Sequence, residues 1–488
     1  MASTFHIQNF GCRAARADGE AIAAILRNSG AAENPPTEAD VVIVNTCSVT
    51  AEADREARAW IRRTHRHNPE ARIIATGCYA QRAPEELAAL PGIVAVIGNS
   101  HKAFAPEIAR TLMPLRAPST SGLIQIQEAS AASAATQVLA DDTFAHSFLE
   151  EAPITPGAQT RPNLKIQEGC SNRCSFCVIP QTRGNSRSLA PSAVLNHVRS
   201  FVEAGGNELV LSGINLGRWG RELDRSPSEP RTLAALVRAI FDETSLPRLR
   251  LSSIEPMDWD IDLISVVQEF SGTRLARHTH LPLQSGSDSV LRRMHRRYRP
   301  WHYVGKVAEL LRAAGPCLTV GADVMVGFPG ETDREFQESY DFIRSLPFGY
   351  LHLFPFSPRP GTRAWSLHAE APVPAAAVTE RISALRALAA EKTRAHRAQF
   401  VGTELGAITL HTLPTLALDG RSSALTDNFI PVELAGSISA NHLLRVRITG
   451  IAPDARLMAS PLLAASAQGE PVSCPQSEPA AHLLERAF

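Results

Sequence analysis

The sequence has no excess of charge of either sign. It contains 49 lysines and arginines against 49 aspartates and glutamates, and its formal net charge at pH 7 is zero. A chain without a global basic field does not attract a polyanion from a distance. Any contact with a nucleic acid must therefore come from a local basic patch.

Long hydrophobic runs are absent as well. No apolar stretch reaches the roughly 20 residues that a membrane-spanning helix needs, although hydrophobic residues make up an ordinary 44% of the chain. The first residues, MASTFHIQNFGC, have neither the basic region nor the apolar core of a signal peptide. We therefore expect a cytoplasmic protein that does not contact a membrane.

The 488 residues are enough for three domains. Strand-like runs alternate with helical runs in residues 1–114, which predicts an α/β domain with a parallel sheet. Residues 115–160 are rich in Ala, Ser, Thr and Pro and are expected to form a linker, in which GLIQIQ could add an edge strand.

The second half of the chain changes character twice. Residues 161–394 contain six successive strand and helix signals, which predict a partial or complete barrel with active residues at the carboxyl ends of its strands. Residues 395–459 consist of short β-branched runs separated by turn residues, which is typical of a small antiparallel barrel. Residues 460–488 are expected to be a loose tail.

Three of the eight cysteines lie close together, directly after a predicted strand. Cys170, Cys174 and Cys177 have the spacing C-x3-C-x2-C. In a reducing compartment such thiols are more often metal ligands than disulfides. Three thiolates on one loop can hold three irons of a four-iron cluster and leave the fourth iron open. The alternatives are a zinc site, which normally needs a fourth ligand that the neighbouring sequence does not offer, or simply buried thiols.

Three further cysteines occupy equivalent places in the first domain. Cys12, Cys47 and Cys78 each follow the carboxyl end of a predicted strand. In a parallel sheet these ends share one edge, where ligand sites gather. The topology therefore predicts a second three-cysteine cluster site. The alternative is that each thiol is packed separately, as isolated cysteines commonly are.

The motifs around these cysteines resemble those of the radical S-adenosyl-L-methionine (SAM) methylthiotransferases. In chain order they are GC near the amino terminus, NTCSVTAEADREAR, TGCYAQ, the central cysteine triad, LSSIEP, LPLQSGSDSVLRRM and VGFPGET. The resemblance covers almost the whole chain. It implies an α/β enzyme with an amino-terminal methylthiotransferase domain, a radical SAM (β/α) partial barrel and a carboxyl-terminal RNA-binding barrel of the TRAM type.

The resemblance also implies the cofactors, the chemistry and the partners. The expected cofactors are two 4Fe-4S clusters and SAM. Cys170, Cys174 and Cys177 would hold the catalytic cluster that cleaves SAM to a radical, while the amino-terminal triad would hold an auxiliary cluster that supplies sulfur. The expected partners are transfer RNA and an external electron donor such as a flavodoxin or ferredoxin, and the chain is expected to be a monomer.

Within the family, NTCSVT, LSSIEP and HRRYRP resemble the branch that acts on N6-threonylcarbamoyladenosine beside the anticodon. The branches for isopentenyladenosine and for an aspartate of a ribosomal protein are less similar. An alternative function of another class is that of an iron–sulfur electron-transfer or RNA-binding protein without group transfer. The chain departs from the family at Ala15, where asparagine is usual.

Other residues are assigned more loosely. The resemblance suggests SAM contacts at Glu208 in GGNELVLSG, Ser253 in LSSIEP, Gln284 in LPLQSGS and Gly327 in VGFPGET, although tight strand-to-helix turns would explain the glycines equally well. The stretch RRMHRRYRPWH interleaves arginines with aromatics, as RNA-binding surfaces do. Within it we expect RNA contacts at Arg296, Arg297 and Arg299, unless the stretch is only a solvated helix face.

Overall fold

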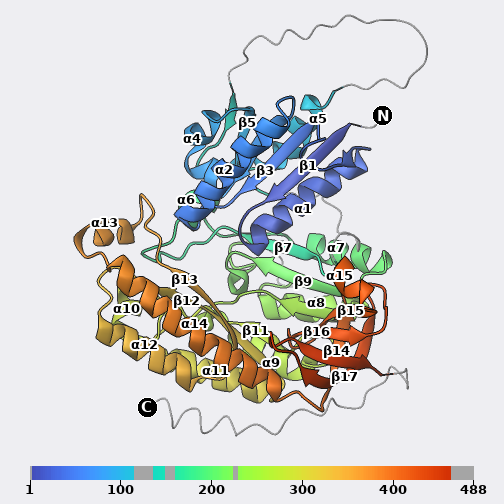
Figure 1. The fold of residues 1–488 in the computed structure, drawn as a ribbon, viewed down its shortest axis with the longest axis vertical. Helices are drawn as coiled ribbons and strands as arrows, with labels where there is room; N and C mark the ends of the chain where they lie inside the picture. Colours follow the sequence, from blue (N-terminus) through green and yellow to red (C-terminus); the bar gives the residue numbers. More distant parts are fainter. Residues whose placement is uncertain (1–2, 115–135, 149–159, 224–228, 463–488) are drawn as a thin grey trace, which may run out of the picture. The chain divides into compact units, whose positions relative to one another are not determined.

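The computed structural model describes residues 3–114, 136–148, 160–223 and 229–462 (Figure 1). Its contacts divide the chain into two compact units. The first consists of residues 1–154 with 168–172 and 177–186, and the second contains the rest. Within the described ranges, no helix is both long and apolar enough to cross a membrane.

The first unit is built on a parallel sheet with the strand order β2-β1-β3-β4-β5-β6. Its strands are β1 (Thr4–Asn9), β2 (Ala32–Glu33), β3 (Val41–Thr46), β4 (Arg72–Gly77), β5 (Ile93–Gly98) and β6 (Gln137–Leu139). The order of the first five is that of flavodoxin-like doubly wound folds, in which ligands bind where the strand order reverses, between β1 and β3. The α/β fold expected from the sequence is confirmed.

Both faces of this sheet are covered by helices. Side chains alternate along a strand, so Val41 and Ile43 pack in one apolar core while Val42 and Val44 pack in the other. A strand that is buried on both faces must be apolar throughout, as VVIV is. The helices of this unit are α1 (Arg13–Asn28), α2 (Ala51–His67), α3 (Cys78–Arg82), α4 (Pro84–Ala88), the 3-10 helix η1 (Asn99–Phe104), α5 (Ala105–Leu112) and α6 (Ile179–Arg183).

The second unit contains the expected partial barrel. Its parallel strands are β7 (Asn163–Glu168), β9 (Glu208–Gly213), β10 (Arg248–Leu251), β11 (His278–His280), β12 (Thr319–Val326) and β13 (Phe348–Pro355), with the short β8 (Arg187–Ser188) beside β7. The sheets β10-β9-β7-β8 and β11-β12-β13 meet where the amide of Ile254 donates to the carbonyl oxygen of His280 (3.1 Å). Six strands therefore follow one another in chain order around the barrel wall.

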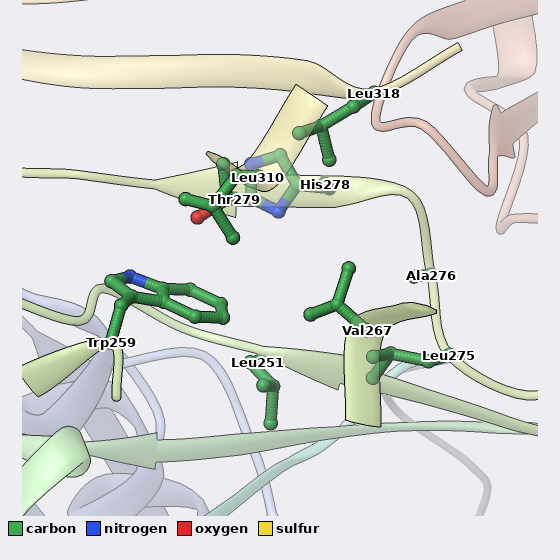
Figure 2. Close-up of a pocket in the computed structure, with 9 residues that line it drawn as sticks. All are labelled: Leu251, Trp259, Val267, Leu275, Ala276, His278, Thr279, Leu310 and Leu318. Carbon is green, nitrogen blue, oxygen red and sulfur yellow. The ribbon is translucent and has the colours of Figure 1, made fainter. Parts of the chain in front are cut away.

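Helices connect these strands. They are α7 (Pro191–Glu203), η2 (Leu216–Arg218), α8 (Leu233–Glu243), η3 (Pro256–Asp258), α9 (Ile261–Phe270), α10 (Asp288–Arg293), α11 (Pro300–Ala314), α12 (Asp333–Ser345), α13 (Arg363–Glu370) and the long α14 (Ala375–Ala398). Between β10, β11, α9 and α11 lies a cavity of about 10 Å³, with the rings of Trp259 and His278 among apolar side chains (Figure 2). It holds one water molecule at most, so it is a packing gap and not a substrate site.

The chain then forms a closed barrel with the order β14-β15-β16-β18-β17. Its elements are β14 (Glu404–Thr409), α15 (Pro414–Leu418), β15 (Arg421–Thr426), β16 (Pro431–Ala435), β17 (Leu443–Ile451) and β18 (Leu457–Pro461). The predicted small barrel is confirmed, with one difference: β16 and β18 pair in parallel. Arg277, next to β11, donates to both carboxylate oxygens of Asp427 (2.6 and 3.0 Å) and so joins this barrel to the partial barrel.

One local expectation needs correction. The sequence predicts a strand through THLPLQ, but β11 ends at His280 because Pro282 has no amide hydrogen and Gln284 has a positive φ of 66°. The expected linker contributes the edge strand β6, which pairs in parallel with β5. The GLIQIQ segment lies outside the described residues.

Candidate functional site

The three amino-terminal cysteines lie at the carboxyl edge of the first sheet. Cys12 is the N-cap of α1, Cys47 follows β3, and Cys78 is the first residue of α3 directly after β4. Cys12 is exposed and the other two are buried, and all three are free thiols. The strand order therefore brings together residues that are far apart in the sequence.

Close packing of the chain holds this group together. Gly11 has a φ of +103°, and a β-carbon added there would lie 2.6 Å from the sulfur of Cys47, so only glycine fits beside this thiol. Burial, followed by the neighbouring thiols of Cys78 and Cys12, raises the pKa of Cys47 to about 12. A buried thiol with this pKa ionises readily only beside a cation that takes up its negative charge.

Two nitrogen donors are directed at the sulfur of Cys78. Arg183 Nε lies 3.2 Å and Asn99 Nδ2 lies 3.4 Å from Sγ. Asn99 also donates to the carbonyl oxygen of Thr182 (2.7 Å), the residue before Arg183. Hydrogen bonds to ligand sulfurs are typical of iron–sulfur sites, where they tune the reduction potential.

Arg183 belongs to a fully buried group of four charges. Its Nη1 lies 2.5 Å from Glu168 and 3.3 Å from Asp18. Lys102 pairs with Asp18 and lies 3.8 Å from Glu168. Two cations and two carboxylates balance one another, which is the condition for keeping them out of water. The sequence pattern around Arg183 gave no sign of these partners.

Ala15, the departure from the family pattern, is also buried. Its carbonyl oxygen accepts a hydrogen bond from Nδ2 of Asn45, which in turn lies 3.0 Å from Oδ1 of Asn9. Asn45 precedes Cys47 by two residues, so it ties α1 to β3 next to the cysteines. The backbone of Ala15 therefore serves this contact whatever its side chain.

The second cysteine triad lies on the loop between β7 and α6. Cys170, Cys174 and Cys177 are partly exposed and form no disulfide. Gly169, with a φ of +68°, starts the loop, and a β-carbon there would lie 2.0 Å from the carbonyl oxygen of Asn185. The amide of Cys170 donates to the carbonyl oxygen of Gly184 (3.0 Å), and the amide of Asn172 lies 3.4 Å from Sγ of Cys170. Backbone contacts thus fix both ends of the loop.

Arg296 is a neighbour of the central cysteines and not an RNA contact. Its Nη1 lies 3.3 Å from Sγ of Cys174, and its Nη2 lies 2.7 and 2.5 Å from the carboxylate oxygens of Glu255. Only 7% of the residue is exposed. The expectation that Arg296 meets RNA is wrong because a buried guanidinium with these partners cannot reach a phosphate.

The other two arginines of that stretch are also paired. Arg297 lies 3.1 Å from Asp258, and Arg299 lies 3.2 Å from Asp288. Their side chains are 38% and 26% exposed. The charge pattern alone predicted a basic face, but the carboxylates that neutralise it come from other segments. The stretch therefore offers less free positive charge than its sequence indicates.

The four residues expected near SAM fall into two places. Ser253, Gln284 and Gly327 follow the carboxyl ends of β10, β11 and β12. Glu208 is the first residue of β9, at the opposite end of the strands, and is fully buried. Burial opposes its ionisation, but Arg250, Arg248 and Arg161 lower its pKa to about 2.

The assignment of Glu208 to SAM is therefore corrected. Its carboxylate lies 2.9 Å from Arg250, 3.4 Å from Arg248 and 3.5 Å from Arg161. Arg250 also donates to the carbonyl oxygen of Thr426 in the small barrel (3.2 Å). Glu208 is thus the centre of an ionic group at the amino-terminal end of the strands of the partial barrel.

A polar cluster that the sequence did not single out spans three neighbouring strands. His280, Asp323 and His352 come from β11, β12 and β13, and their ligand atoms all lie within 4.8 Å of one another. Ser253 Oγ lies 2.7 Å from Nδ1 of His280. Burial disfavours the charge of Asp323, yet the two histidines hold its pKa below its usual range. His280 and Asp323 lie just before the motifs LPLQSGSDSVLRRM and VGFPGET, but the pairing of β12 with β13 could not be predicted.

The two cysteine triads fit iron–sulfur clusters by the chemistry of their donors. Each offers three thiols outside any disulfide, and in each an arginine nitrogen is hydrogen-bonded to a cysteine sulfur, Arg183 to Cys78 and Arg296 to Cys174. Three thiolates leave one iron of a four-iron cluster open. Such a site can bind a small chelating ligand and pass it an electron.

Comparisons with known proteins agree with this geometry. Residues 4–98 match the family described as "Uncharacterized protein family UPF0004", and residues 164–343 match the "Radical SAM superfamily". The chain is 32% identical to "Threonylcarbamoyladenosine tRNA methylthiotransferase MtaB" of Bacillus subtilis, over 89% of this chain and 91% of that protein. The protein of that name from Aquifex aeolicus is 32% identical over 84% and 91%. A "tRNA-2-methylthio-N(6)-dimethylallyladenosine synthase" of Geobacter metallireducens is 32% identical over 93% and 97%.

Proposed function

Because this chain belongs to the radical SAM methylthiotransferase family, we propose that it attaches a methylthio group to C2 of N6-threonylcarbamoyladenosine next to the anticodon of transfer RNA. The observation that carries the proposal is the presence in one chain of two separate sets of three cysteines that form no disulfide. The substrate follows from the relatives named for threonylcarbamoyladenosine. The nearly equal identity to an enzyme for dimethylallyladenosine makes that base the alternative to test.

Cys170, Cys174 and Cys177 would hold the cluster that binds SAM, and Cys12, Cys47 and Cys78 would hold the auxiliary cluster. When bound, these groups supply an electron, a carbon-centred radical, and the sulfur and methyl that are transferred.

The contribution of the chain itself is to position these groups. Arg296 orients Cys174 and offsets negative charge there, with Glu255 fixing its guanidinium. Ser253, Gln284 and Gly327, which follow the carboxyl ends of three strands, would contact SAM, because active residues of such barrels gather at these ends. Gly327 has a φ of +77°, and a β-carbon there would lie 2.6 Å from a methyl carbon of Val378, so only glycine fits at this turn.

The closed carboxyl-terminal barrel is proposed to bind transfer RNA, as a TRAM domain would. With zero net charge, its contribution must come from local contacts and stacking. An external flavodoxin or ferredoxin would supply the electron, and the chain is proposed to act as a monomer in the cytoplasm.

Nucleoside mass spectrometry of transfer RNA from a strain lacking this protein tests the substrate. The 2-methylthio form of threonylcarbamoyladenosine should disappear and return when the gene is restored. If that nucleoside persists and 2-methylthio-isopentenyladenosine is missing instead, the substrate is wrong and the chemistry stands. If both persist, methylthiolation of transfer RNA by this protein is wrong.

The two triads should be separable in the purified protein. Changing Cys12, Cys47 and Cys78 to Ala should leave reductive SAM cleavage and abolish methylthio product. Changing Cys170, Cys174 and Cys177 to Ala should abolish both activities. An iron–sulfur electron carrier without group transfer would cleave no SAM in any form, so this measurement also separates the two classes of function.

A further inference from the structure

We propose that His280, Asp323 and His352 bind one divalent transition-metal ion, and that the open positions of this ion take an anionic oxygen of the substrate's N6 substituent. The second half of this statement rests on the proposed function. The first half concerns the free protein and can be tested without RNA.

The separations of the three side chains fit a common ion. Asp323 Oδ1 lies 3.2 Å from Nε2 of His280 and 3.3 Å from Nδ1 of His352. Two ligand atoms bonded to one ion at about 2.1 Å are about 3.0 Å apart at a right angle and about 3.4 Å apart at a tetrahedral angle. Two imidazoles and one carboxylate are also a common ligand set for divalent iron, manganese and zinc.

His280 is held in the way that metal-binding histidines usually are. Its Nδ1 is 2.7 Å from Oγ of Ser253, which leaves Nε2 to face Asp323. Nε2 is buried and has no aligned hydrogen-bond partner, although the carboxylate lies so near. A polar partner on the far ring nitrogen fixes the orientation of a ligating imidazole. A cation between Nε2 and the carboxylate would satisfy both atoms.

The cluster is closed on one side and open on the other. The side chain of His280 is 6% exposed, that of Asp323 25% and that of His352 56%. Tyr350 packs against both imidazoles, with ring centroids 6.0 Å from His280 and 5.1 Å from His352. The rings are therefore supported by packing, while solvent or a ligand can approach from the His352 side.

Charge indicates which ligand the open side would accept. Without a metal, the ionised Asp323 gives the cluster a negative charge that repels a carboxylate. A divalent ion reverses the sign and leaves coordination positions free, because only three are taken by the protein. The threonylcarbamoyl group carries a carboxylate, whereas an isopentenyl group is purely hydrocarbon. A metal here would therefore favour the first substrate over the second.

The test uses the reconstituted full-length protein, free Mn²⁺ as the probe and electron paramagnetic resonance to count bound ions. We expect one site per chain, with affinity at least tenfold weaker in Asp323→Asn and in His352→Ala. His411→Ala, which changes an exposed histidine of the other barrel, is the matched control and should bind as the parent does. Equal binding by Asp323→Asn, His352→Ala and the parent would overturn the site. Because His352 is exposed, its variant carries the test if Asp323→Asn fails to fold.

A second arm concerns the substrate. His352→Ala should slow methylthiolation of transfer RNA at least tenfold, with RNA-free SAM cleavage unchanged. If Mn²⁺ binding is lost but methylthiolation is unaffected, the ion does not hold the substrate and that half of the proposal is wrong. If the parent methylthiolates no transfer RNA, the proposed function fails while the Mn²⁺ result still decides the metal site.

Discussion

At the scale of single residues, buried arginines organise the charged interior of this protein. Arg183 meets Cys78 and two carboxylates, Arg296 meets Cys174 and Glu255, and Arg250 meets Glu208. Each guanidinium makes several directed hydrogen bonds, which arginine can do and lysine cannot. Removing one partner from such a buried group leaves an uncompensated charge, and that is more costly than the pair itself is stabilising.

Glu208 gives the sharpest prediction of this kind. Glu208→Gln should lower the free energy of unfolding by about 3–5 kcal/mol, because Arg250 and Arg248 then lose their shared carboxylate inside the protein. Denaturant unfolding monitored by circular dichroism measures this loss. SAM binding by the folded fraction should be unchanged, since Glu208 lies at the amino-terminal end of its strand, away from the carboxyl ends where SAM is expected. A variant that is as stable as the parent but binds SAM more weakly would restore the original assignment.

At the scale of elements, regular segments could be predicted and their partners could not. The sequence predicts a helix from Ala51 to His67, and α2 has these bounds, because Thr50 caps it and Pro69 follows its end. All six proposed cluster cysteines stand in the places that strand ends predict. The predicted SAM contact of Glu208 was wrong because Glu208 is the first residue of β9, at the end of the strand opposite to the carboxyl edge. The predicted RNA contact of Arg296 was wrong because Arg296 is buried against Glu255, which lies on another segment of the chain.

Helix α14 carries a prediction about pH. His396 is buried on this helix, 2.9 Å from Oγ1 of Thr319, and burial followed by the charge of Arg397 lowers its pKa to about 4. Its unfolded pKa is near 6.5. Between these values the unfolded chain binds a proton that the folded chain does not, so stability falls as the pH drops from about 6.5 to about 4, by roughly 3 kcal/mol at most.

The substitution His396→Gln isolates this contribution. The difference in unfolding free energy between parent and variant should shrink or reverse as the pH is lowered through that window, because only the parent gains the proton on unfolding. Thermal melts at pH 7, 6 and 5 would measure it. A difference that stays constant with pH would show that His396 is protonated alike in both states.

At the scale of the whole molecule, one buried guanidinium connects the two cysteine sites. Arg183 is hydrogen-bonded to Cys78 of the first triad and to Glu168, which lies two residues before Cys170 of the second. All these residues belong to the same compact unit, although they are far apart in the sequence.

Arg183→Gln should therefore alter both sites at once. Without the positive charge beside Cys78, the auxiliary cluster should be harder to reduce by at least tenfold in equilibrium constant, about 59 mV for one electron. Iron content at the central site should also fall, because Glu168 loses its main partner. Potentiometric titration and iron analysis measure these effects, with Arg72→Gln on the exposed surface as the control. An effect confined to one site would contradict the connection.

The placement of Arg183 also limits which parts of the chain can be separated or exchanged between related proteins. A segment consisting only of the amino-terminal sheet would retain Asp18, Lys102 and Cys78 but lack Arg183 and Glu168. The thiol of Cys78 would then keep the Asn99 donor but lose the guanidinium. The sheet and the central cysteine loop therefore cannot be exchanged independently of each other. A chimera that exchanges one must exchange the other with it, and sequence changes at Asp18, Lys102, Glu168 and Arg183 are expected to be inherited as a set.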